Sequence, residues 1–158
     1  MKYFLTILFL ITFLSGCDSY RPEKLPKGSI IEKDTVITTT VNRSLSIVAN
    51  QSESVYLKIE TLFGKKVRDL LIEGDIYTNA NTGIATIKPI KLRISAGAIP
   101  LSGEAYTKSN DKGLLIECGK PSSSECGLFE IDKGTEILVK LTSELDLSGI
   151  VITTAENK

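Results

Sequence analysis

The chain has 158 residues, of which 42% are hydrophobic, and its 19 lysine and arginine residues balance 19 aspartate and glutamate residues. This length is typical of one domain with a core of its own. The balanced charge and the lack of a basic stripe argue against nucleic-acid binding, so we expect no nucleic-acid partner.

The chain begins like an exported protein. Lys2 supplies a positive charge, residues 3–14 are apolar apart from two threonines, and Ser15 and Gly16 are small. This order is typical of a secretory signal peptide, and the apolar run is shorter than the ~20 residues that a membrane-spanning helix needs. We therefore predict that residues 1–16 are a cleaved signal peptide.

The cysteine that ends this segment indicates a lipid anchor. Leu14-Ser15-Gly16-Cys17 resembles the lipobox of bacterial lipoproteins, which implies a diacylglyceryl group on the Cys17 sulfur and cleavage before that residue. A plain signal peptide that ends near a cysteine is the alternative. Because two or more acyl chains anchor a protein stably, we expect a chain that faces the periplasm and is held at a membrane without spanning it. Asp18 resembles an inner-membrane retention signal of enterobacteria, but other bacteria read this position differently, so the choice of membrane stays open.

The rest of the chain reads as one β domain on a short tether. Residues 17–27 are polar and contain two prolines, which predicts a flexible, lipidated tether. Residues 28–154 consist of short, β-branched, alternating segments between turn residues, which predicts a single all-β domain, a small β-barrel or β-sandwich. Residues 155–158 form a polar tail. The strands are expected within 35–41, 45–49, 55–61, 84–95, 135–142 and 149–155.

One segment fits two patterns. The alternation of Val55, Leu57 and Ile59 predicts a strand, whereas the apolar residues from 55 to 71 also fit a helical stripe. Gly64 weakens the helical interpretation. We predict a strand up to residue 61, then a turn, then a short helical turn over 65–70. The full set of expected turns is Asn50, Gly64, Gly74, 79–83, 96–97, 109–113 and 132–134.

The segment 84–94 is predicted to be a strand with an irregularity. Alternation places Lys91 and Arg93 on one face, and Ile87 falls out of phase with the apolar face. Pro89 cannot donate a hydrogen bond to a neighbouring strand, which indicates a β-bulge or a sheet edge. The residues expected to share the apolar face are Ile84, Ile90, Leu92 and Ile94.

The charges of this segment suggest a protected edge. Lys88, Lys91 and Arg93 carry positive charges, and natural sheets place such charges on edge strands to prevent indiscriminate pairing. We predict that they mark an edge that faces a protein partner. An ordinary solvated strand is the alternative.

The two remaining cysteines are predicted to form a disulfide bond. Cys118 and Cys126 enclose a segment with Gly119, Pro121 and three serines, which is typical of a turn. The compartment outside the cytoplasmic membrane is oxidising, and closing so short a loop stabilises a fold by roughly 2–3 kcal/mol. A metal-binding pair is the weaker alternative, because the chain has no histidine and no third thiol remains.

The sequence indicates a protein that is not an enzyme. It contains no histidine to serve as a general base, no glycine-rich phosphate loop and no cluster of metal ligands, so we expect no cofactor and no metal. Glu73 and Asp75 would share a face of an alternating strand, and a glycosidase needs such a pair. A single close pair of carboxylates is common on any surface, so a hydrolase is the least favoured function.

The order of segments from residue 26 to residue 147 resembles the C-terminal β domain of the TrbI/TraB family, which forms part of the core of type IV secretion and conjugation machines. The resemblance lies in a first strand after a glycine, a long central strand between glycine turns, and a last strand after Gly134-Thr135. The positions that match in the centre are Leu71, Ile72, Gly74, Gly97, Leu101, Asp111 and Gly113.

The departures from this family matter as much. The family has an inner-membrane helix and a proline-rich arm, and it inserts a membrane-crossing helical hairpin about where this chain has residues 117–126. The resemblance therefore implies a docking part of a secretion or conjugation apparatus, without pore formation. The alternative is an envelope lipoprotein that acts as a binding module, such as an inhibitor or exclusion factor.

Overall fold

The computed structural model describes residues 19–109, 114–115 and 127–156. Within these ranges the chain is all β and contains no helix, which confirms the predicted class. The strands are β1 (Tyr20–Lys24), β2 (Ile30–Ile31), β3 (Val36–Val41), β4 (Leu45–Val48), β5 (Ser52–Ile59), β6 (Thr61–Leu62), β7 (Lys65–Arg68), β8 (Leu71–Asn79), β9 (Ile84–Ile94), β10 (Gly97–Pro100), β11 (Gly103–Tyr106), β12 (Leu114–Leu115), β13 (Leu128–Ile131), β14 (Glu136–Leu141), β15 (Leu145–Asp146) and β16 (Val151–Ala155).

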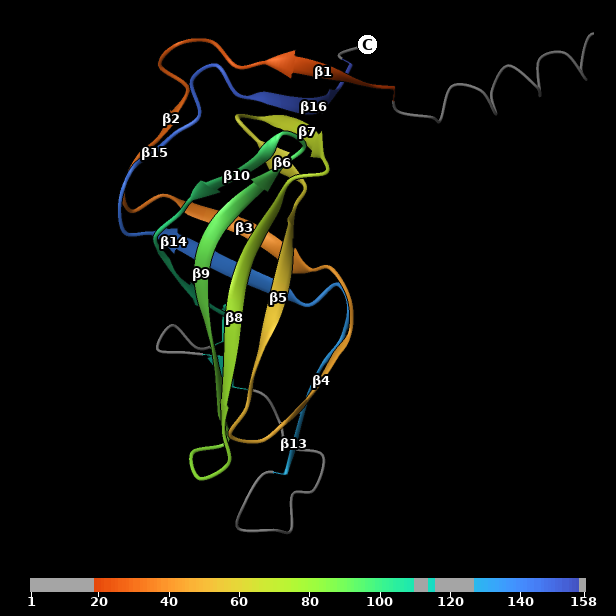
Figure 1. The fold of residues 1–158 in the computed structure, drawn as a ribbon, viewed down its shortest axis with the longest axis vertical. Coiled ribbons are helices and arrows are strands. Elements are labelled where there is room, and N and C mark those ends of the chain that lie inside the picture. Colours follow the sequence, from red (N-terminus) through yellow and green to blue (C-terminus); the bar gives the residue numbers. More distant parts are fainter. Residues whose placement is uncertain (1–18, 110–113, 116–126, 157–158) are drawn as a thin grey trace, which may run out of the picture.

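A curled sheet of seven antiparallel strands forms a half-barrel (Figure 1). Its strand order is β10-β9-β8-β5-β3-β14-β11, and β12 pairs with β9 beside this path. Three smaller sheets complete the described fold: β1-β16-β7-β6, β13-β4 and β15-β2. The six segments predicted to be strands contain β3, β4, most of β5, β9, β14 and β16, so these predictions are confirmed.

The half-barrel is held together by one core, which is aliphatic apart from Phe129. In β14, alternate residues Ile137, Val139 and Leu141 are fully buried, as period-two patterning requires. Thr39 is the polar exception on the matching face of β3, and its Oγ1 donates a hydrogen bond to the carbonyl oxygen of Ile137 at 2.8 Å. The buried hydroxyl is thus satisfied, and the core stays intact.

Two segments from opposite ends of the chain are related by an approximate two-fold symmetry. β2-β3-β4 pairs with β15-β14-β13 in one continuous antiparallel register. Asp34 N–H donates to the Leu141 carbonyl and Gly134 N–H donates to the Val41 carbonyl, both at 2.9 Å. Asp34 and Gly134 both have positive φ angles, 69° and 87°. The sequence analysis did not detect this repeat, which fixes β3 and β14 side by side between β5 and β11.

The irregularity predicted near Pro89 is a β-bulge. Gly74 pairs with Pro89, whereas Glu73 pairs with Lys91, so Ile90 is the extra residue. The bulge shifts the phase of β9: Ile87 is buried and Ile90 is exposed, which corrects the predicted apolar face. The predicted turn at Gly74 is also wrong, because Gly74 lies inside β8. A Cβ atom there would be 2.6 Å from the Lys88 carbonyl oxygen, so the close approach of two strands requires glycine.

Part of the segment predicted to be a tether belongs to the β fold. Residues 20–24 form strand β1, which pairs with β16 from Tyr20↔Ala155 to Lys24↔Val151 (Figure 1). Glu156 N–H also donates to the Ser19 carbonyl at 2.8 Å. The β fold therefore begins by residue 20 instead of 28, and its last strand extends into the predicted tail. The sequence pattern does not reveal this strand, because the strand is short and mostly polar.

Candidate functional site

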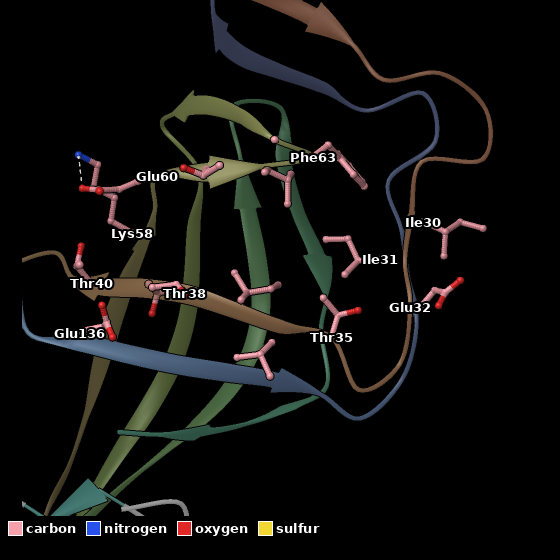
Figure 2. Close-up of a pocket in the computed structure, with 16 residues that line it drawn as sticks. Ile30, Ile31, Glu32, Thr35, Thr38, Thr40, Lys58, Glu60, Phe63 and Glu136 are labelled. Atoms are coloured by element: carbon pink, nitrogen blue, oxygen red, sulfur yellow. Dashed lines mark ion pairs between the residues drawn. The ribbon is translucent and has the colours of Figure 1, made fainter. Parts of the chain in front are cut away.

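An open groove lies between β3 and the hairpin formed by β6 and β7 (Figure 2). Its volume is about 640 Å³, which falls in the range of binding pockets for small ligands and short peptide segments. The connection from β2 to β3 closes one end. The residues that line it are Ile30, Ile31, Glu32, Thr35, Val36, Ile37, Thr38, Thr39, Thr40, Lys58, Glu60, Thr61, Leu62, Phe63, Gly64 and Glu136.

The groove exists because β5 leaves its neighbour early. β3 pairs with β5 only from Thr39 to Val41, and after Ile59 the chain turns away into β6. Within the described part of the chain, no strand pairs with Val36, Ile37 or Thr38 on that side. Both inward-facing and outward-facing residues of β3 line the groove, so it follows the edge of the strand and does not lie on one face of the sheet.

The hairpin beside the groove has a strained tip. Phe63 and Gly64 form a two-residue turn between β6 and β7, with φ angles of 49° and 73°. Two positive φ angles are typical of a type I′ turn, which favours asparagine and glycine. A phenylalanine in this conformation is unusual, and such strain gathers at binding sites. The turn at Gly64 was predicted, but the predicted helical turn over 65–70 is wrong, because residues 65–68 form β7.

Exposed apolar side chains surround the groove, and buried ones form its floor. Phe63 is 46% exposed, Val36 44% and Ile30 39%, although each is a large hydrophobic residue. Ile31 and Leu62 are buried beneath them, and Figure 2 shows Ile31 and Phe63 reaching into the space from two sides. An apolar patch of this kind, framed by polar groups, is typical of an interaction surface.

Carboxylates dominate the charged part of the lining. Glu32 lies in the connection from β2 to β3, Glu60 between β5 and β6, and Glu136 in β14, against one ammonium group from Lys58 (Figure 2). Lys58 Nζ lies 3.9 Å from Glu60 Oε1. Glu136 pairs outside the lining with Lys108 at 2.9 Å, and Glu32 forms no ion pair among the described residues. The groove therefore has a net negative lining.

The residues predicted to form an edge lie within a paired strand. Lys91 and Arg93 pair with β8 on one side and with Pro100 and Ala98 of β10 on the other, so the predicted edge is wrong there. Lys88 is exposed and lies between the stretches of β9 that β10 and β12 cover. A partner contact at these three residues stays a prediction, but strand addition at residues 91–94 is blocked.

Two of these residues, Lys91 and Arg93, form ion pairs with Glu73. Glu73 Oε2 accepts a hydrogen bond from Arg93 Nε at 2.6 Å and lies 3.7 Å from Lys91 Nζ. The hydrogen bond from Arg93 holds the pKa of the Glu73 carboxyl below its ordinary value. Asp75 lies on the same face of β8, as its spacing from Glu73 predicted. The Glu73 carboxylate is thus committed to holding β8 and β9 together.

Several predicted positions lie outside the described residues. These are the lipidation site Cys17, the two cysteines of the predicted disulfide, Cys118 and Cys126, and the family-like Asp111 and Gly113. Their predicted roles therefore stay predictions.

Within the described ranges, no group of three or more histidine, cysteine or acidic residues could hold a metal ion, and no helix is long and apolar enough to cross a membrane. Sequence reasoning missed the groove. Phe63 beside Gly64 in a short polar segment was the one local sign, since glycine at a turn is common but phenylalanine in front of it is not.

Neither the comparison with protein-family models nor that with curated proteins finds a match for this chain.

Proposed function

We propose that this protein is a lipoprotein of the bacterial cell envelope whose β domain docks onto another envelope protein through the groove beside β3. The observation that carries the proposal is the groove itself: three exposed apolar residues, one of them the strained Phe63, beside a strand edge that no described strand covers. Natural proteins usually cover such an edge. A partner that covers it would bury apolar surface and satisfy the strand's backbone.

The proposed anchor is a lipid on Cys17, with the chain facing the periplasm. β1 begins at Tyr20, so only two residues would separate the lipidated cysteine from the strand. A domain attached so closely stays beside the membrane surface and suits short-range docking within an assembly. We propose that the half-barrel and the small sheets together form a single barrel-like domain, whose disulfide between Cys118 and Cys126 closes one loop.

The assembly we favour is a type IV secretion or conjugation apparatus. The support is the resemblance of residues 26–147 to the TrbI/TraB β domain, in which the turn positions Gly97 and Gly134 match and have positive φ angles here. Gly74 departs from that pattern, because it lies within a strand. We propose a docking role without catalysis, since the described groove offers carboxylates and threonines but no nucleophile paired with a base.

The second candidate is an envelope binding module, an inhibitor or exclusion factor outside any secretion machine. The groove supports this candidate as well as the first, because an open apolar groove can hold a segment of a protein outside a secretion machine too. The identity of the partner separates the two functions.

Crosslinking in intact cells tests the proposal. A photo-crosslinking amino acid placed at Phe63 of the full-length protein should capture an envelope protein, identified by mass spectrometry. The control is Tyr77 on the outer face of β8, which is also well exposed at 47% and lies outside the groove. A secretion component captured at Phe63 alone supports the first candidate, and an unrelated envelope protein supports the second. Equal yields at both positions, or no protein at either, would overturn docking through the groove.

A further inference from the structure

The backbone of β3 presents hydrogen-bonding groups to the groove. Val41 exchanges hydrogen bonds with Gly134 and Thr135 on the β14 side, and the Thr35 carbonyl accepts from Leu141 on that same side. Because the backbone groups of successive residues in an antiparallel strand point to alternate sides, even-numbered residues of β3 point the other way. Val36 and Thr38 thus face the groove, where β5 has already ended.

This geometry suits an added strand better than a compact ligand. A peptide in extended conformation can exchange N–H and C=O bonds with Val36 and continue the sheet where β5 leaves it. Its alternate side chains would then lie against the apolar residues of the groove, Phe63 among them. A compact small molecule would leave part of this edge uncovered.

The charges of the groove select among extended segments. Three glutamates against one lysine favour a segment that carries lysine or arginine, and Glu32 has no competing ion pair among the described residues. Complementary charge guides encounter and disfavours acidic competitors. In a segment that alternates apolar and basic residues, the apolar side chains would lie on the floor of the groove and the basic side chains would lie at the carboxylates.

We propose that the groove binds an extended segment of the partner, with alternating apolar and basic residues, as an additional strand on β3. This inference rests on the proposed docking function and names the chemistry of its partner. The occupant is a peptide segment of another protein, and the contact is formed by backbone hydrogen bonds at Val36 together with the apolar and acidic lining.

Selection from a displayed library of random peptides tests the chemistry. The full-length protein in detergent is the bait, and a Phe63→Asn variant serves for counter-selection. We expect the enriched peptides to alternate apolar residues with lysine or arginine. When the backbone nitrogens of one selected peptide are methylated one at a time, binding should be abolished only at every second residue. No excess of basic residues, or equal sensitivity to N-methylation at neighbouring positions, would overturn the inference.

A matched pair of variants tests the backbone contact. Val36→Pro removes the N–H that faces the groove but leaves the bonds on the β14 side, a place where strands tolerate proline. Val36→Thr keeps the N–H and the side-chain shape. The selected peptide should bind Val36→Pro about tenfold more weakly and Val36→Thr nearly as well as the wild type. Equal affinity of the two variants would exclude strand addition at Val36.

The two proposals fail in different ways. Crosslinking of an envelope protein at Phe63 without the basic, alternating preference would retain docking and overturn the strand-addition inference. The expected peptide preference without any crosslinked protein in cells would retain the binding chemistry of the groove and overturn the docking function.

Discussion

Glu73 of β8 and Arg93 of β9 are joined across the strand pair by a hydrogen bond of 2.6 Å, and the carboxylate is shielded, with its side chain 15% exposed. Lys91 adds a second positive charge at 3.7 Å. The bond lies next to the bulge where the register of β8 and β9 shifts. It therefore joins β8 and β9 at the place where the bulge interrupts their regular hydrogen bonding.

This bond predicts an acid-sensitive part of the stability. The hydrogen bond from Arg93 lowers the pKa of Glu73 below its ordinary value of 4.5, so the folded state favours the ionised carboxyl. Its contribution is complete above that value and is lost as the pH falls through the folded pKa. Glu73→Gln should lower stability at pH 7 and flatten the decline in acid, measured by urea unfolding at several pH values.

The control for this experiment is Asp75→Asn, on the same face of β8, because Asp75 forms no ion pair among the described residues. Its acid decline should follow that of the wild type. Part of the decline will remain in Glu73→Gln, since the hydrogen bond from Lys65 also lowers the pKa of Glu23. An acid decline in Glu73→Gln as steep as that of the wild type would show that the Arg93 bond contributes nothing.

The turn at Phe63 predicts an opposition between stability and binding. Phe63→Asn places a residue that tolerates φ near 49° in the type I′ turn, so thermal unfolding should shift upward or stay unchanged, a gain of up to about 1 kcal/mol. The same variant should lose its partner in cells. A melting temperature well below that of the wild type would instead make Phe63 a structural residue.

The close approach at Gly74 predicts a costly substitution. Gly74→Ala puts a Cβ atom 2.6 Å from the Lys88 carbonyl oxygen, and β8 and β9 must then move apart. We expect a loss of about 1–3 kcal/mol in the free energy of unfolding. Gly127→Ala is the matched control, because nothing lies within 4 Å of its added Cβ atom and Gly127 has no positive φ angle. Similar losses in both variants would contradict the steric explanation.

Lipidation is predicted at Cys17. Metabolic labelling with a fatty acid should mark the wild-type protein, and Cys17→Ser should abolish the label and release the exported chain from membranes. The mature N-terminus, determined by mass spectrometry, should be Cys17. Any other mature N-terminus would contradict the lipobox interpretation.

A disulfide is predicted between Cys118 and Cys126. Mass spectrometry of the exported protein under non-reducing conditions should find the two residues in one linked peptide. The Cys118→Ser/Cys126→Ser double variant should still fold and melt at a lower temperature, because the aliphatic core carries most of the stability. Two alkylatable thiols in the exported protein would refute the bond.

Period-two alternation predicted six of the sixteen described strands, among them four of the seven in the half-barrel, because it reports directly which face is buried. It failed where the backbone departs from regular pairing. At Ile90 the bulge reverses the phase of a strand, and at Gly74 a glycine that looks like a turn allows two strands to approach. β1 is too short and polar to show a buried face, so only its pairing with β16 reveals it.

The groove could not be predicted, because it depends on where β5 parts from β3. That point is set by packing between strands and leaves no periodic trace in either one. The edge at Lys91 and Arg93 was wrongly predicted for a related reason: charges that protect an edge look the same in sequence as charges that pair with Glu73 inside a sheet.

The pairing between the two ends of the chain dictates an order of events during synthesis. Among the described residues, β1, β2 and β4 form ladders only with β16, β15 and β13, so these ladders cannot form until the last strands have been made. The β5-β8-β9-β10 meander, whose partners are neighbours in sequence, closes much earlier. The strands that are made first therefore fold last.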